Sequence, residues 1–218
     1  MPQSTVLTAA PSRRQGASAN LAEPRAARTH EALTTALFDL LREHDLTEIS
    51  ISELCRTAGV HRTTFYGHYA DIFAFAADSF ARQLDELAAV AETAGSMDDE
   101  SVETINAVYA ASITRELEHI RDHRAAYRMM FGTRVDAGFR RELFQRTLVR
   151  ASIAISIWQR KDDSRRIDSP AAAAYIAGGM VGVLEEWTYS DDTDAEARTA
   201  DVVAAWPAWC AAHVPPMV

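Results

Sequence analysis

The side chains best suited to chemistry gather in one short stretch, TAGVHRTTFYGHYAD, which spans residues 57–71. Hydroxyl, imidazole, guanidinium and phenol groups follow one another there, directly after a glycine. A guanidinium can donate two hydrogen bonds to a guanine, and threonine and tyrosine hydroxyls can contact phosphates. Such a polar set also suits the solvated face of any helix hairpin, so the residue types alone leave both interpretations open.

The sequence predicts two short helices that meet at Gly59. Ser50, with Glu53 three residues later, forms a capping box that marks the start of the first helix. This helix should stop at Gly59, because glycine adopts a positive φ without steric cost. A second helix over about residues 61–66 would turn Phe65 inward and its polar side chains outward. This pattern predicts a helix-turn-helix, whose second helix can enter the major groove of DNA.

The string AGVHRTTFYGHYAD closely resembles the signature of the TetR family of bacterial transcriptional regulators. The matching positions are Ala58, Gly59, Val60, Thr64, Phe65, Tyr66, His68, Tyr69 and Asp71. The resemblance is specific over about residues 25–75, and beyond them only the helical pattern is similar. It departs from the family at His61, where serine is common, and at Ile72, where a phosphate-binding lysine is usual.

The resemblance implies base or phosphate contacts from the second helix and backbone anchoring from the start of the first. Separately, upstream arginines such as Arg28 can compensate for the lysine that is missing at position 72. The resulting candidate set for DNA binding is Arg28, Ser50, Ser52, His61, Arg62, Thr63, Thr64, Tyr66 and His68. The expected partner is a palindromic double-stranded DNA operator, bound by a homodimer. The expected function is that of a repressor that releases DNA when a small molecule binds.

The distribution of charge limits where DNA can bind. The net charge of the chain is −9, which is the wrong sign for a generic nucleic-acid binder. Residues 1–70 hold 7 arginines and 7 acidic residues, whereas residues 71–218 hold 15 basic and 24 acidic ones. DNA contact must therefore come from the N-terminal part, and its sequence-independent component should be modest.

Composition predicts an all-α fold of about nine helices. Alanine-rich and aliphatic segments dominate, and few stretches alternate with period two. We expect an arm without regular structure over residues 1–24, a helix-turn-helix domain over 25–70, and a helical regulatory and dimerisation domain over 71–218. The predicted helices cover residues 25–44, 51–58, 61–66, 72–93, 102–121, 124–131, 136–161, 170–189 and 194–213.

Several features predict a cytoplasmic protein that does not associate with membranes. The first 20 residues lack the apolar core of a signal peptide. The longest apolar run, residues 171–184, has 14 residues, fewer than the roughly 20 that span a bilayer. The two cysteines lie far apart in sequence, which fits a reducing compartment better than a disulfide framework.

The resemblance implies that the second part binds an effector and forms a dimer, and the residues suggest where. Small residues would let helices of two subunits approach closely, so we predict a dimer interface from Gly178, Gly179, Gly182, Val183, Trp187, Val202 and Trp206. Methionine and aromatic side chains suit an apolar pocket. The candidate ligand-binding residues are Tyr109, Met129, Met130, Phe131, Phe139, Phe144 and Trp158. In both sets, plain core packing is the alternative.

We expect neither a metal, a cofactor nor an enzymatic activity. His119 and His123 have a spacing that can bind a metal, but no third ligand is clear from the sequence. The chain has no Walker loop, HExxH or CxxC motif. The stronger alternative to a DNA-binding regulator is a TetR-like adaptor that acts through protein–protein contacts without binding DNA.

Overall fold

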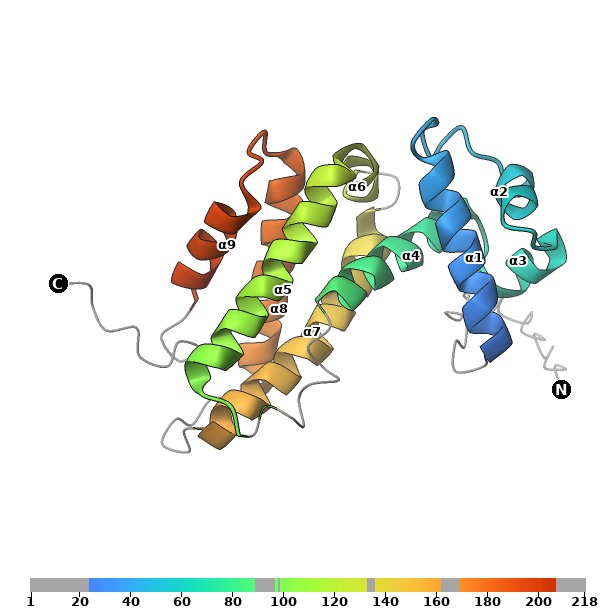
Figure 1. The fold of residues 1–218 in the computed structure, drawn as a ribbon. Helices are drawn as coiled ribbons and strands as arrows, with labels where there is room; N and C mark the ends of the chain where they lie inside the picture. Colours follow the sequence, from blue (N-terminus) through green and yellow to red (C-terminus); the bar gives the residue numbers. More distant parts are fainter. Residues whose placement is uncertain (1–23, 89–96, 98, 133–135, 162–168, 207–218) are drawn as a thin grey trace, which may run out of the picture.

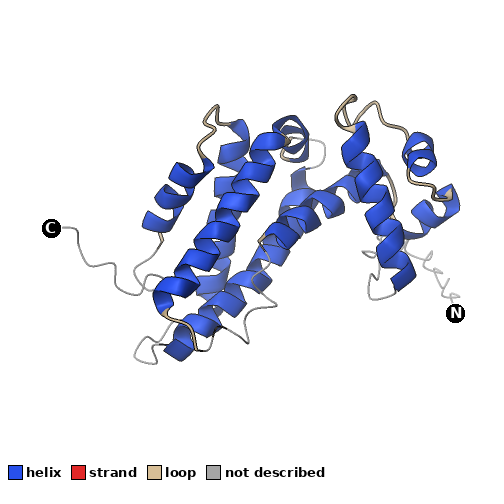
Figure 2. Ribbon diagram, viewed as in Figure 1, coloured by secondary structure: helices blue, strands red, loops and turns tan. Residues whose placement is uncertain are grey.

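The computed structural model describes residues 24–88, 97, 99–132, 136–161 and 169–206. Within these ranges all regular structure is α-helical and no strand occurs, which confirms the predicted fold class (Figure 2). The helices are α1 (Pro24–Leu40), α2 (Ile51–Thr57), α3 (Arg62–His68), α4 (Ile72–Leu87), α5 (Val102–Asp122), α6 (Arg124–Met130), α7 (Asp136–Lys161), α8 (Ser169–Tyr189) and α9 (Ala195–Ala204).

Most predicted helix boundaries agree with these, and three helices end earlier than expected. The chain leaves α1 at Leu40 and forms turns up to residue 44. α4 stops at Leu87 instead of residue 93, and α9 stops at Ala204 instead of residue 213. The early end of α9 has a visible cause in the sequence, because Pro207 follows and disfavours helical backbone at the residue before it. The predicted arm lies almost entirely outside the described residues.

The helices form two groups joined by α4 (Figure 1). α1, α2 and α3 pack together at one end. At the other end α5, α7 and α8 lie side by side, and α9 packs on α5. α4 packs against α1 on one side and against α5 and α7 on the other. The same helix therefore carries the N-terminal group and joins the C-terminal bundle.

One contiguous core runs through both groups. Phe75, Phe80 and Leu84 of α4 are fully buried in it, together with Leu37 of α1 and Trp187 of α8. A smaller apolar cluster between α5, α7 and α8 contains Ile105, Ile155 and Trp158, among others. No described helix is long and apolar enough to cross a membrane.

The turn between α2 and α3 is built on Gly59. Its φ is 66°, the left-handed region that glycine favours. The Val60 N–H donates to the Cys55 carbonyl at 2.9 Å, and the Gly59 N–H donates to the Arg56 carbonyl at 3.3 Å. These two bonds are the pair that defines a Schellman motif, so the last carbonyls of α2 are satisfied while the chain reverses into α3.

We predict that Gly59→Ala lowers the free energy of unfolding by about 1 kcal/mol, because a Cβ is strained at positive φ. No heavy atom beyond the chain neighbours lies within 4 Å of the Cβ position, so the cost would be that of the backbone alone. Gly67→Ala is the matched control. Gly67 is helical and exposed with equally open surroundings, and alanine there should stabilise by about 0.5 kcal/mol. Urea unfolding followed by circular dichroism measures both, and equal effects of the same sign would refute this explanation.

Candidate functional site

The sequence-predicted DNA-binding residues lie at the surface of the N-terminal helices. Arg62, Thr63, Thr64 and Tyr66 are exposed on α3, whereas Phe65 between them is fully buried. Tyr66 is 51 % exposed although it is a large aromatic residue. The Arg62 guanidinium lies 5.9 Å from the centre of the Tyr66 ring. The two side chains therefore form one outward-facing group with hydrogen-bond donors at its surface.

The remaining candidates flank this group. Ser50, Ser52 and His61 are exposed, and His68 is half-buried at the end of α3. Arg28 is exposed on α1, where its Nε donates to the Pro24 carbonyl. All nine candidates thus present at least part of their side chains to solvent.

The caps of α2 and α3 differ from the expectation in detail. Ser50 caps α2, because its hydroxyl accepts from the Glu53 N–H at 3.1 Å. A full capping box also needs the Glu53 carboxylate to accept from the Ser50 N–H, and no such bond occurs among the described contacts. Glu53 Oε1 instead lies 4.0 Å from Arg56 Nη2. His61 occupies the N-cap position of α3 without a side-chain cap bond. Ile72, at the position of the family's lysine, is buried and points into the core.

α3 is held from inside by two aromatic residues. The Phe65 ring packs edge-to-face on Phe75, with centroids 5.7 Å apart. Tyr69 ends α3 in extended backbone, and its buried hydroxyl donates to Asp78 Oδ2 of α4 at 2.7 Å. Tyr69 is one of the positions that match the TetR signature, but the sequence alone does not identify Asp78 as the partner of its hydroxyl. The only signal was that a buried tyrosine hydroxyl needs one.

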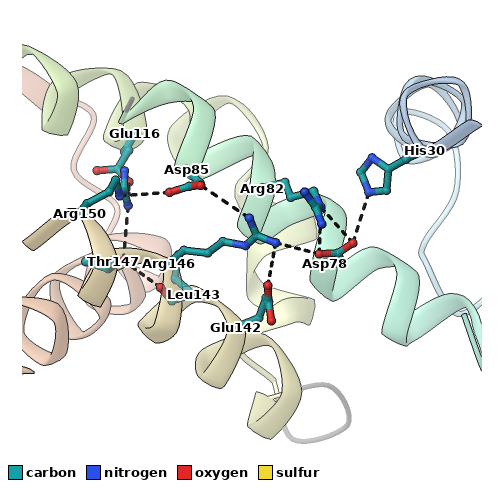
Figure 3. A network of polar contacts seen from close by, with 10 residues as sticks. All are labelled: His30, Asp78, Arg82, Asp85, Glu116, Glu142, Leu143, Arg146, Thr147 and Arg150. Atoms are coloured by element: carbon teal, nitrogen blue, oxygen red, sulfur yellow. Dashed lines mark hydrogen bonds and ion pairs between the residues drawn. The ribbon is translucent and has the colours of Figure 1, made fainter. Parts of the chain in front are cut away.

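Asp78 of α4 has partners on α1, on α7 and at the end of α3; Figure 3 shows those from α1, α4 and α7. Besides Tyr69, its carboxylate accepts from Arg82 Nε at 3.1 Å and from Arg146 Nη2 of α7 at 3.0 Å. The ring of His30 on α1 lies 3.5 Å away. Burial alone would raise the pKa of Asp78, but the contact with His30 and the bonds from Tyr69 and Arg82 outweigh it and hold the pKa well below its usual range. Asp78 is therefore an ionised group inside the protein.

The polar contacts continue along α7 away from the helix-turn-helix (Figure 3). Arg146 also pairs with Glu142 at 2.7 Å and lies 3.6 Å from Asp85 of α4. Asp85 in turn lies 3.2 Å from Arg150 Nε, and Arg150 Nη2 donates to Glu116 Oε1 of α5 at 3.3 Å. We call this row, from His30 to Glu116, the polar row. It connects α1 to the interior of the C-terminal bundle.

A cavity of about 70 Å³ lies at the far end of the polar row, between α5, α7 and α8. Glu116, Arg150, Thr147 and Ser112 form its polar wall, and Tyr109, Trp158 and Trp206 form an aromatic one. Burial raises the pKa of Tyr109 to about 12. Burial also raises the pKa of the Glu116 carboxyl, a shift that the nearby Arg150 opposes. None of these four polar residues is among the ligand-binding residues predicted from the sequence, and Trp206 is among those predicted for the dimer interface.

Only two of the seven predicted ligand-binding residues line the cavity, Tyr109 and Trp158. Met130, Phe131 and Phe139 are buried in the main core, and Met129 and Phe144 pack against it. These five side chains do not line this cavity. The methionine and aromatic types were appropriate, but apolar side chains near the junction of α6 and α7 fill the interior instead.

The predicted dimer residues also divide into two groups. Gly178, Gly179 and Gly182 are exposed on α8, next to Tyr175, which is 64 % exposed. Trp187 is fully buried, and its Nε1 donates to the Leu117 carbonyl at 2.8 Å. Val202 is also buried in the core. Val183 and Trp206 are half-buried, and Val183 packs against the core while Trp206 packs on Trp158. The interior position of Trp187 and Val202 corrects their assignment to a dimer surface.

The two histidines considered for a metal lie close together inside one subunit. Their ring centroids are 4.4 Å apart, and both rings pack on Phe38 of α1. Burial, with a smaller effect from His123, lowers the pKa of His119 to about 4. Among the described residues no group of three potential metal ligands occurs. The pair therefore contributes to packing between α1 and α5.

Comparison with known proteins adds no family assignment. No protein-family model matches the chain, and no curated protein matches it. The function proposed below therefore rests on the residues of the site and their geometry.

We predict that Asp78→Asn lowers the free energy of unfolding by about 3 kcal/mol at pH 7, because three donors would face a neutral amide. The folded-state pKa of Asp78 is lowered, so its contribution is fully present above the unfolded value near 4. This contribution to stability is lost as the pH falls towards the pKa of Asp78 in the folded protein. The difference between wild type and variant should therefore stay constant from pH 7 to about pH 5 and shrink as the pH falls below about 4.

The matched control is Asp39→Asn, where the carboxylate is exposed and lies 3.7 Å from Arg42. Its effect should stay below about 0.5 kcal/mol at every pH. Urea unfolding at several pH values measures both variants. A loss for Asp78→Asn that is small or independent of pH would contradict the role given to this carboxylate.

Proposed function

We propose that the protein is a ligand-responsive DNA-binding transcriptional regulator of the TetR type, which acts as a homodimer. The observation that carries the proposal is the outward presentation of Arg62, Thr63, Thr64 and Tyr66 by a helix whose intervening Phe65 is fully buried. A side-chain set of this kind at the start of a second helix suits base edges and phosphates. The capped N-terminus of α2 offers free N–H groups as a further phosphate contact.

The proposed dimer uses the exposed face of α8. Gly178 and Gly182 lie one turn apart and allow close approach of a second helix. Tyr175 adds apolar area beside them. A twofold axis through this face would pair two α3 helices, as a palindromic site requires.

The proposed response begins in the cavity and reaches α3 through α4. A molecule that contacts Arg150 changes the partner of Asp85, and Asp85 lies two turns from Asp78 on the same helix. Asp78 holds Tyr69 at the end of α3. Release of DNA requires only that the effector bind the conformation with unsuitable α3 spacing more tightly.

The second candidate, an adaptor without DNA binding, is favoured by a different observation. The basic and acidic residues of positions 1–70 balance, and Ile72 is buried where the family has a phosphate-binding lysine. Selection of genomic DNA fragments with the purified protein separates the two candidates. Enrichment of a palindrome with half-sites about one helical turn apart supports the regulator. Enrichment of no sequence supports the adaptor.

We predict that Thr64→Ala combined with Tyr66→Phe weakens binding to the selected operator about tenfold or more, because two hydroxyl contacts are lost. Both residues are exposed and neither supports the core, so folding and dimerisation should be unchanged. The matched control is Thr104→Ala combined with Tyr189→Phe, which removes the same groups from exposed positions on α5 and α8. Band-shift titration measures affinity, and equal affinities of the two double variants would refute the contact assignment.

We predict that Gly178→Glu converts the dimer to a monomer, because a charged side chain would separate the two α8 helices. Glutamate favours helix more than glycine does, so the fold itself should not suffer. Gly138→Glu on α7 is the matched control, since this glycine is also exposed with open surroundings. Light scattering after size-exclusion chromatography gives the masses. A Gly178→Glu protein that remains dimeric would remove this face from the proposal.

A further inference from the structure

The cavity contains a carboxylate that the protein leaves incompletely paired. Glu116 is 3 % exposed and lines the cavity. Its Oε1 accepts one long bond from Arg150, and its Oε2 accepts none from a described residue. A buried carboxylate is costly unless its charge is balanced and its oxygens are hydrogen-bonded. A ligand that supplies positive charge or donors at this position would remove that cost.

The neighbouring charges leave the polar wall short of positive charge. Arg150 is shared by Glu116 and Asp85, so two carboxylates face one guanidinium. Arg146 lies near Asp85 but is already paired with Asp78 and Glu142. Arg115 on α5 is exposed, and its Nε donates to the Leu87 carbonyl. The cavity end of the polar row therefore carries a negative excess.

The donors at this wall that have no partner of their own are out of reach of an anionic ligand. Among the described residues Arg150 Nε and Nη1 have no partner of hydrogen-bond geometry, although Nε lies 3.2 Å from Asp85, and both atoms are buried without accessible surface. The same holds for Trp158 Nε1. A carboxylate in the cavity would therefore meet Glu116 without reaching these donors. A cationic group in the cavity would instead be attracted by the Glu116 carboxylate.

The remaining walls suit the body of an organic cation. Tyr109, Trp158 and Trp206 form a continuous aromatic row, with centroids 5.5 Å and 5.9 Å apart. Aromatic faces attract cations through their quadrupole, and a carboxylate beside them completes a site for an amine. The cavity volume of about 70 Å³ is smaller than the roughly 150 Å³ of an engineered cavity that binds benzene. A ligand with an aromatic ring therefore fits only by displacing a side chain that lines the cavity.

We propose that this cavity binds a compact organic cation with a flat apolar body, and that Glu116 is its counter-ion. The ammonium group takes the place of Arg150 at Glu116, which leaves Arg150 to pair with Asp85 of α4. The class of ligand follows from the residues of the cavity. Its role as the effector rests on the proposed function.

Three probes of nearly the same shape test the proposal on the full-length protein without DNA. They are benzylammonium, benzyl alcohol and benzoate, compared by calorimetry or by tryptophan fluorescence at neutral pH. Benzylammonium should bind at least about tenfold more tightly than the other two, the size of one charge-assisted hydrogen bond. Benzoate binding as tightly as benzylammonium, or no probe binding at millimolar concentration, would overturn the proposal.

Variants assign the preference to one residue. Glu116→Gln should abolish the advantage of benzylammonium over benzyl alcohol, whereas Glu116→Asp should keep part of it. Glu103→Gln, an exposed glutamate on the same helix, should leave it unchanged. A preference that survives in Glu116→Gln would overturn the counter-ion role. If that variant does not fold, the ranking of the probes by the wild type still decides the ligand class.

Operator binding is measured separately, so the two proposals fail in different ways. Selection of an operator together with no preference for the cation would overturn the effector class alone. A cation preference in a protein that selects no DNA sequence would overturn the proposed regulator and leave the ligand class standing.

Discussion

The buried carboxylate of Asp78 is the constraint on which the relation between the two helical groups depends. It is 9 % exposed as a side chain, and its partners come from α1, the end of α3, α4 and α7. A single charge in this position would be costly, and removal of any one partner leaves the others around an incompletely satisfied group. Apolar packing on α4 tolerates small shifts, whereas hydrogen bonds to one carboxylate are directional. The hydrogen bonds to Asp78 therefore restrict the orientation of α3 relative to α7 more than the surrounding apolar contacts do.

The same constraint explains how α3, with seven residues, can present an ordered surface. Helices this short are unstable alone, so tertiary contacts must hold them. Phe65 and Tyr69 supply these contacts from the inner face, and the Schellman turn at Gly59 fixes the approach from α2. The outer face is then free to carry polar groups with no structural task. Because residues 1–70 have no net positive charge, such a surface would rely on specific hydrogen bonds more than on general attraction to phosphates.

The helices could be predicted from the sequence because local signals determine them. Ser50, Asp71 and Asp194 cap α2, α4 and α9 as their types suggest, and Pro170 marks the start of α8. The polar row could not be predicted, since Asp78 lies within the apolar helix IFAFAADSFARQLDEL and its partners are far away in sequence. The prediction of the cavity residues failed for a related reason. Methionine and aromatic side chains fill cores and pockets alike, so Phe139 and Trp158 look equivalent until packing places one in the core and the other at the cavity.

The two ends of the polar row differ in a way that determines where a signal can enter. At the Asp78 end each carboxylate oxygen has at least two partners. At the Glu116 end one guanidinium serves two carboxylates. A continuous row of contacts does not by itself make two sites interdependent, since coupling requires an element with two discrete arrangements. In the structure Arg150 contacts Glu116 and Asp85 together. The proposed effector would supply the second arrangement, in which Arg150 keeps Asp85 alone. Filling the cavity with apolar atoms alone would not alter these contacts, whereas a charge beside Glu116 would, because it competes directly for one of the two partners of Arg150.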